Sequence, residues 1–176
     1  MMKKFWLALL VLALAASPVV ADECAGPLSF YTVDPCRWLD TRVPGCVVGG
    51  GCWKGPFKDG QTRKYLVQGA AMCPATVRGS VPVGACAIVL NVVATQATGR
   101  GRLVLYNAYL WERPPVSSIN FGVGQTIANM VIAQLGQDPG PPAPILPDLA
   151  IYARVAGGGT VHVVVDMIGY FASSGD

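Results

Sequence analysis

The strongest constraint on the fold comes from the C-terminal sequence LAIYARVAGGGTVHVVVDMIGYF, residues 149–171. Its second half alternates, and one face carries only apolar side chains: Val161, Val163, Val165 and Met167. The opposite face carries Thr160, His162, Val164 and Asp166. A period of two with one apolar face is typical of a strand that packs on one side against a core. Because the glycines of AGGG separate this strand from another apolar run, the sequence predicts a β-hairpin here.

Strand-like patterns continue through the rest of the chain. Residues 84–95, GACAIVLNVVAT, are rich in apolar and β-branched side chains with flanking turns, and they predict a buried central strand. Residues 101–110 alternate, and residues 117–135 predict a short strand, a turn and a longer strand. A helix over 126–135 is the alternative, but β-branched residues and flanking glycines favour a strand. Eight or nine short strands predict an all-β fold, a single-domain antiparallel β-sandwich.

The first 21 residues have the organisation of a secretory signal peptide. Lys3 and Lys4 precede an apolar run that is too short to span a bilayer, and small residues end the segment at Ala21. We therefore expect a secreted protein, residues 22–176, at the cell surface or outside the cell and without a membrane span. Without the two leader lysines, 11 basic side chains face 10 acidic ones. This near balance argues against nucleic acid or an anionic membrane as a partner.

The mature segment holds an even number of cysteines: Cys24, Cys36, Cys46, Cys52, Cys73 and Cys86. In an oxidising compartment we expect disulfide bonds, although the spacing leaves their pairing open. All six precede residue 87, so the disulfides should brace the N-terminal half. The absence of a C-x-x-C pair and the single histidine argue against zinc. Asp34, Asp40 and Asp166 could ligate calcium, but no D-x-D-x-D loop is present, and we expect no metal or cofactor.

The residue patterns favour a protein that is not an enzyme. His162 lies four residues before Asp166 on one strand face, about 13 Å away in an extended strand, which is too far for a catalytic pair. No GxSxG-type nucleophile motif is present. Asp40 lies between Arg37 and Arg42, and neighbouring arginines lower the pKa of a carboxyl group, whereas a general acid in a glycosidase needs a raised pKa.

The segment CRWLDTR, residues 36–42, concentrates charge in a chain with only 13% charged residues. We expect it to close the sandwich, with Arg37 or Arg42 bound to Asp166 or to carbonyl groups at strand ends. A buried, satisfied ion pair would make Arg37, Asp40, Arg42 and Asp166 a structural motif rather than an active site.

Five segments, in this order, resemble a widespread bacterial extracellular module: CRWLDTR, VPVGACAIVLNVVAT, GRLVLYN, SSINFGVGQTIANMVIAQL and IYARVAGGGTVHVVVDMIGYF. Its members open with Leu-Asp-Thr-Arg and close with Asp-x-x-Gly-Tyr-Phe, and the resemblance covers roughly 30–171. The module is often attached to secreted hydrolases and surface proteins, and it also occurs in tandem or alone. The resemblance implies a secreted β-sandwich-like domain and no catalytic chemistry. The chain departs from the pattern at 45–60, 73–80 and 138–147.

Irregular segments hold the side chains that we expect to contact any ligand: Trp53, Lys54, Tyr109, Trp111 and Arg113. Exposed loop aromatics can stack on sugar rings, whereas the competing interpretation is that these rings cover the ends of the core. Low charge and disulfides favour a structural or adhesive role at the cell envelope, with self-association or a surface protein as partner. A carbohydrate-binding module that recognises an envelope polysaccharide is the alternative.

Overall fold

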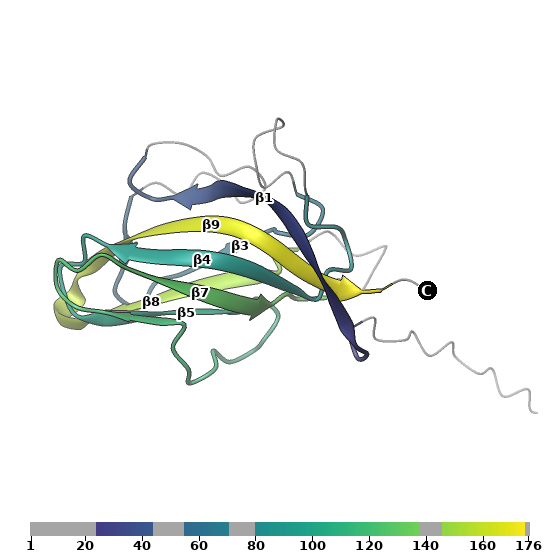
Figure 1. Ribbon diagram of the computed structural model, residues 1–176. Coiled ribbons are helices and arrows are strands. Elements are labelled where there is room, and N and C mark those ends of the chain that lie inside the picture. The colour runs from purple at the N-terminus through teal and green to yellow at the C-terminus, as the bar shows by residue number, and fades with distance from the viewer. Residues whose placement is uncertain (1–23, 44–54, 71–79, 138–145, 175–176) are drawn as a thin grey trace, which may run out of the picture.

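The computed structural model describes residues 24–43, 55–70, 80–137 and 146–174. They form two antiparallel sheets packed together, which confirms the predicted β-sandwich (Figure 1). The first sheet has the order β1 (Leu28–Asp40), β9 (Thr160–Ser173), β4 (Ala87–Thr95) and β7 (Ile127–Gln134), with β2 (Phe57–Lys58) paired to β9. The second has the order β3 (Thr62–Tyr65), β8 (Leu149–Val155), β5 (Gly101–Asn107) and β6 (Ile119–Phe121).

The sequence also predicts a signal peptide and no membrane span in the rest of the chain. The expected signal peptide, residues 1–21, lies outside the described residues. Among the residues that are described, no helix has the length and apolar character needed to cross a bilayer.

The core lies between the two sheets and follows the predicted alternation of β9. All four residues of its predicted inner face are fully buried: Val161, Val163, Val165 and Met167. Leu90 of β4 lies beside Met167 in the same sheet, and Leu103 of β5 and Ile151 of β8 are equally buried in the second sheet. Burying one such side chain stabilises the fold by about 1.5–3 kcal/mol, so this layer holds the sheets together. The preference for a strand over a helix at 126–135 is also confirmed, by β7.

The predicted hairpin at 149–171 is wrong. β8 pairs with β3 and β5 in the second sheet, whereas β9 pairs with β1, β2 and β4 in the first. The chain crosses between the sheets through a short 3-10 turn, η1 (Ala156–Gly158), in which Gly157 and Gly158 have φ of 73° and 71°. Glycine adopts these angles without strain. Because both strands have an apolar side to bury, they pack in opposite layers instead of pairing edge to edge.

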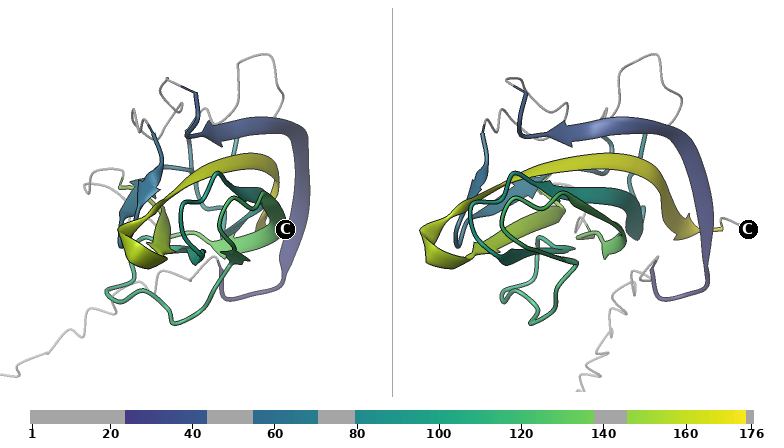
Figure 2. Two further views of the ribbon diagram at one scale, coloured as in Figure 1. Left: turned by 90° about the vertical axis from the view of Figure 1, so that its left-hand side faces the viewer. Right: turned by 60° about the vertical axis from the view of Figure 1, so that its left-hand side comes forward.

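The opening and closing motifs lie on neighbouring strands. β1 and β9 run side by side along the sandwich (Figure 2). Phe30 lies opposite Phe171, with ring centroids 5.2 Å apart, and Tyr31 stacks on Tyr170 at 5.3 Å. A Cβ atom on Gly169 would lie 2.4 Å from the carbonyl oxygen of Tyr31, which no side chain tolerates. The glycine of the Gly-Tyr-Phe motif therefore lets β1 approach β9, and the two aromatic residues then hold it there.

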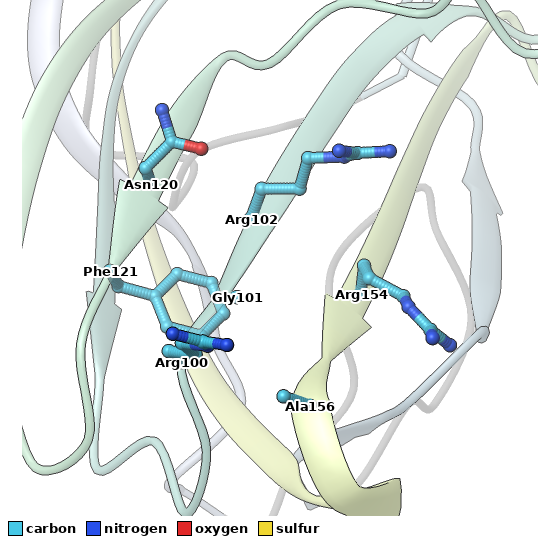
Figure 3. Close-up of a pocket in the computed structure, with 7 residues that line it drawn as sticks. All are labelled: Arg100, Gly101, Arg102, Asn120, Phe121, Arg154 and Ala156. Atoms are coloured by element: carbon cyan, nitrogen blue, oxygen red, sulfur yellow. The ribbon is translucent and has the colours of Figure 1, made fainter.

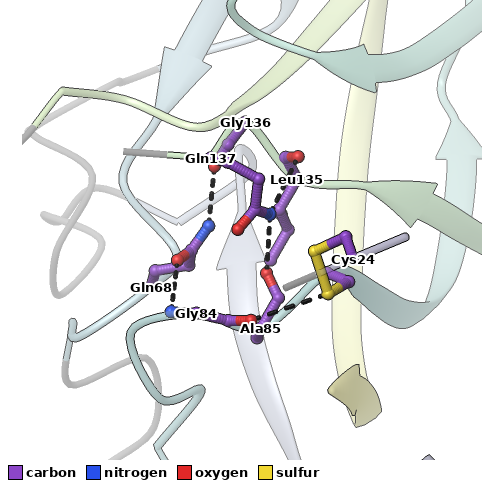
Figure 4. The surroundings of a disulfide bond; sticks show 8 residues. Cys24, Gln68, Gly84, Ala85, Leu135, Gly136 and Gln137 are labelled. Carbon is purple, nitrogen blue, oxygen red and sulfur yellow. Dashed lines mark hydrogen bonds between the residues drawn. A yellow bond between two sulfur atoms is a disulfide. The ribbon is translucent and has the colours of Figure 1, made fainter. Parts of the chain in front are cut away.

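A disulfide bond joins Cys24 to Cys86 across 62 residues of chain and ties the start of β1 to the start of β4 (Figure 4). Beside it, the buried side chain of Gln68 donates to the carbonyl of Gly136 at 2.7 Å. The expected disulfide bracing of the N-terminal half is thus confirmed for this pair, and Cys36 is disulfide-bonded as well. The remaining predicted disulfide cysteines lie outside the described residues: Cys46, Cys52 and Cys73.

Candidate functional site

The charged side chains of CRWLDTR form one cluster on the outer face of the first sheet. Arg42 grips the Asp40 carboxylate with two bonds, Nε to Oδ1 at 2.9 Å and Nη2 to Oδ2 at 2.7 Å. Arg37 bridges two carboxylates, because Nη1 donates to Asp40 at 3.1 Å and Nε donates to Asp166. The Arg37–Asp166 pair is one of those expected from the sequence. The side-chain bond from Arg42 is the main reason why the pKa of Asp40 falls to about 2, so this carboxylate stays ionised.

The cluster differs from the expectation in its burial. The side chains of Arg37 and Arg42 are 49% and 43% exposed, and only the carboxylate of Asp40, at 11%, is well covered. Half-exposed guanidinium groups avoid most of the desolvation cost of a buried ion pair. Arg37, Asp166 and Asn91 also line a hollow of about 530 Å³ beside the cluster, in which the Asp166 carboxylate is already bound to Arg37.

The buried polar residue of the motif is Thr41, which the charge pattern of the sequence does not single out. Its backbone N–H donates to the carbonyl of Val163 at 3.0 Å, and its Oγ1 accepts from the Val163 N–H at 2.8 Å. The same hydroxyl lies 3.0 Å from Nδ1 of His162. Burial lowers the pKa of His162, so its ring is neutral at pH 7. The motif therefore attaches the end of β1 to β9 through hydrogen bonds, and His162 takes part in this contact.

The predicted ligand-contacting residues are only partly described and do not converge. Trp53 and Lys54 lie outside the described residues. The side chain of Trp111 is fully exposed in the loop at 108–118, which connects β5 to β6. This ring does not cover the end of the core, so the competing interpretation fails for Trp111.

The other two predicted contacts, Tyr109 and Arg113, point to different surroundings. Tyr109 lines a small hollow of about 90 Å³ near Gly136, at the end of the sandwich that carries the Cys24 disulfide. Arg113 lies over the ring of Tyr152 on β8, with Cζ 3.7 Å from the ring centroid. It therefore covers part of the outer face of the second sheet.

That outer face carries a pocket that the sequence patterns did not reveal. We call it the arginine pocket, about 370 Å³ in volume and lined by Arg100, Arg102, Asn120, Phe121, Arg154 and neighbouring backbone (Figure 3). Arg102 of β5 stands between Asn120 of β6 and Arg154 of β8 in the strand register. The alternation in GRLVLYN places Arg102 on the solvent side, but only the pairing of three distant strands brings these side chains together.

A second surface feature is the open side of β7, which we call the β7 edge. β7 is the last strand of the first sheet and pairs only with β4 among the described residues. Its outward side chains include Met130 and Ile132, which are 65% and 58% exposed. They lie beside Asn91 and Val89 of β4. The outer face of this sheet therefore changes from charged at β1 to apolar at β7.

Comparison of the chain with models of known protein families, with curated proteins and with solved structures finds no match. The resemblance to the bacterial extracellular module stays a prediction that rests on the motifs.

Proposed function

We propose that the protein is a secreted, non-catalytic module with a structural or adhesive role at the cell surface, and that it acts by pairing its β7 edge with that of a second copy. The observation that carries this proposal is the open, uncharged edge strand IANMVIAQ with its exposed Met130 and Ile132. Edge strands are usually protected by lysine, proline or a bulge. β7 has neither residue, and its register with β4 is unbroken.

The chemistry of the strand favours a second copy as the partner. If two β7 strands pair antiparallel about a two-fold axis, no like charges meet, because the strand carries none. Met130 and Ile132 then gain apolar neighbours, and the free backbone groups form hydrogen bonds along about 26 Å of strand. The near balance of charge in the mature segment adds little repulsion between copies.

The roles of Asp40, Asp166 and His162 support the non-catalytic part of the proposal. The hydrogen bond from Arg42 is the main reason why the pKa of Asp40 is lowered to about 2, whereas acid catalysis needs a carboxyl group with a raised pKa. Asp166 forms an ion pair with Arg37. His162 is engaged by Thr41. These side chains are explained by the attachment of β1 to β9.

Sedimentation velocity of the oxidised mature protein, over a range of concentrations, tests the proposal. We expect a concentration-dependent dimer, and Ile132→Lys should leave a folded monomer. Its melting temperature should match that of dilute, monomeric wild-type protein, because this side chain is exposed in the monomer. Val43→Lys is the matched control, since Val43 is 57% exposed beyond the end of β1 at the opposite edge of the sheet. A wild-type monomer at every concentration, or equal effects of the two substitutions, would contradict the proposal.

Carbohydrate binding through loop aromatics is the second candidate, and the full exposure of Trp111 favours it. An exposed indole ring offers a flat apolar surface to the C–H face of a sugar. Retention of the protein on a neutral polysaccharide column, lost in Trp111→Ala at unchanged melting temperature, is the expected result. Lack of retention of the wild-type protein would count against this candidate.

A further inference from the structure

We infer that the arginine pocket binds an acidic sugar of an extracellular polysaccharide through the carboxylate or sulfate group of that sugar. The inference rests on carbohydrate binding as the proposed function, but it places the contact at the arginines of this pocket and not at the loop aromatics. It is independent of β7 pairing, because the pocket lies on the outer face of the other sheet.

The pocket carries positive charge that the described residues do not balance. Arg102 lies directly opposite Arg154 on the neighbouring strand, and like charges in that position destabilise a sheet. Arg154 is neutralised by Asp59, whose two carboxylate oxygens lie 2.9 Å and 3.1 Å from its Nη1. Arg100 and Arg102 have no side-chain hydrogen bond or ion pair within the described ranges. A bound anion would supply the missing partner of Arg100 and Arg102.

The pocket is also held in shape before any ligand arrives. Asp59 accepts a hydrogen bond from the N–H of Val155 at 2.9 Å, so the carboxylate that positions Arg154 is itself fixed to the end of β8. A Cβ atom on Gly101 would come within 2.0 Å of the carbonyl oxygen of Arg154 and within 2.7 Å of the Phe121 ring, so glycine is needed for the approach of both β8 and this ring. The glycine therefore lets the edge of this ring line the pocket next to the arginines (Figure 3).

The lining matches the parts of an acidic sugar. A guanidinium group binds a carboxylate or sulfate with two parallel hydrogen bonds, and an amide such as that of Asn120 can bind a hydroxyl group. Ala156 and the exposed edge of the otherwise buried Phe121 ring add a small apolar surface beside the arginines. A volume of about 370 Å³ is in the range of small-molecule sites.

A polysaccharide fits this surface better than an isolated ion or a nucleic acid. Arg113 stacks on Tyr152, which lies two residues before Arg154 on the same outward side of β8, so positive charge continues beyond the pocket. Successive acidic sugars of a linear polymer can meet these charges in turn. Binding to nucleic acid would need many more phosphate contacts than a chain of nearly balanced charge supplies.

The experiment measures binding of the oxidised protein, by isothermal titration calorimetry, to polygalacturonate, dextran sulfate, neutral dextran and single-stranded DNA. The first two polymers distinguish a carboxylate from a sulfate ligand. We expect Arg102→Gln to raise the Kd for the preferred acidic polymer about 10- to 100-fold, because a charge-assisted hydrogen bond is lost. Arg102→Lys keeps the positive charge but loses the planar guanidinium group, so its Kd should lie between those of the wild-type protein and Arg102→Gln.

Arg37→Gln is the control, since it removes the same charge from the outer face of the other sheet. Binding to an acidic polymer that is lost in Arg102→Gln and kept in Arg37→Gln supports the inference. Each of the following results would overturn it: no binding to either acidic polymer, an equal loss in Arg37→Gln, or equally tight binding to DNA. If Trp111→Ala abolished binding to acidic and neutral polymers while Arg102→Gln changed neither, the loop would be the carbohydrate site and the arginine pocket would not.

Discussion

Replacing Asp40 by asparagine isolates the charge of the CRWLDTR cluster. The asparagine side chain would keep the shape of the original and could still accept from the backbone N–H of Arg42, which bonds Asp40 Oδ1 at 3.0 Å. What it loses is the attraction of a carboxylate to the guanidinium groups of Arg42 and Arg37. We therefore expect Asp40→Asn to fold and to be less stable than the wild-type protein at neutral pH.

The magnitude follows from the pKa of Asp40. The folded protein lowers it from 3.8 to about 2, and this difference corresponds to at most about 2.4 kcal/mol of stability at pH 7. Because both arginines are about half exposed, solvent screens their attraction to Asp40. We therefore expect Asp40→Asn to lower the free energy of unfolding by about 1–2 kcal/mol. For a domain of this size that loss lowers the melting temperature by about 2–8 °C.

The pH dependence gives the sharper assay. A carboxyl group whose pKa is lowered by folding stabilises the protein fully above its unfolded pKa of 3.8, and this contribution is lost as the pH falls through about 2. The difference in unfolding free energy between wild type and Asp40→Asn, from urea titrations, should therefore be constant from pH 7 to about 5 and should shrink towards pH 2. High salt should reduce it as well.

Asp34→Asn serves as the control, because Asp34 is exposed on the same strand and forms no ion pair among the described residues. We expect it to change stability by less than about 0.5 kcal/mol. A difference for Asp40→Asn that stayed the same at pH 2 and pH 7, or that was no larger than that of Asp34→Asn, would refute the reasoning.

Four further variants test the rest of the framework by thermal unfolding. Arg42→Ala should lower the melting temperature and leave ligand binding of the folded protein intact, and lost binding at unchanged stability would make the motif a site. Joint replacement of Cys24 and Cys86 by serine opens a 62-residue loop and should cost about 4 kcal/mol; an unchanged melting temperature would contradict the bracing role. Met167→Ala, in the core, should cost about 2–5 kcal/mol, whereas Met130→Ala at the exposed β7 edge should cost less than about 0.5 kcal/mol. Similar losses at both methionines would mean that the burial of β9 is misjudged.

The inner face of the sandwich could be predicted from the sequence because alternation is a local property. The alternation along β9 predicts that Val161 and Val163 are buried, and the alternation along β5 predicts the same for Leu103. The pairing of strands is not local. The glycine-rich link at 156–159 suits a hairpin and a crossing between sheets equally well, and only the burial of both apolar faces decides between them.

The candidate sites show the same division. Arg37, Asp40 and Arg42 are close in sequence, so their mutual binding could be predicted, and the motif order suggested Asp166 as a further partner. The role of Thr41 could not be predicted, because the charge pattern does not reveal a buried hydroxyl group that forms a hydrogen bond with a distant strand. The arginine pocket was missed for a related reason. Arg102 and Arg154 are far apart in sequence, and only strand register makes them neighbours.

The central claim, that the β7 edge pairs with a second copy, is tested most directly by amide hydrogen exchange measured at low and high concentrations of the mature protein. If the claim is right, the β7 amides that face away from β4 will gain protection as the concentration rises, while the amides of β3 at an edge of the other sheet will not. In Ile132→Lys the gain should disappear. Protection of β7 that is independent of concentration, in a protein that is shown by sedimentation to associate, would place the contact elsewhere and contradict the account.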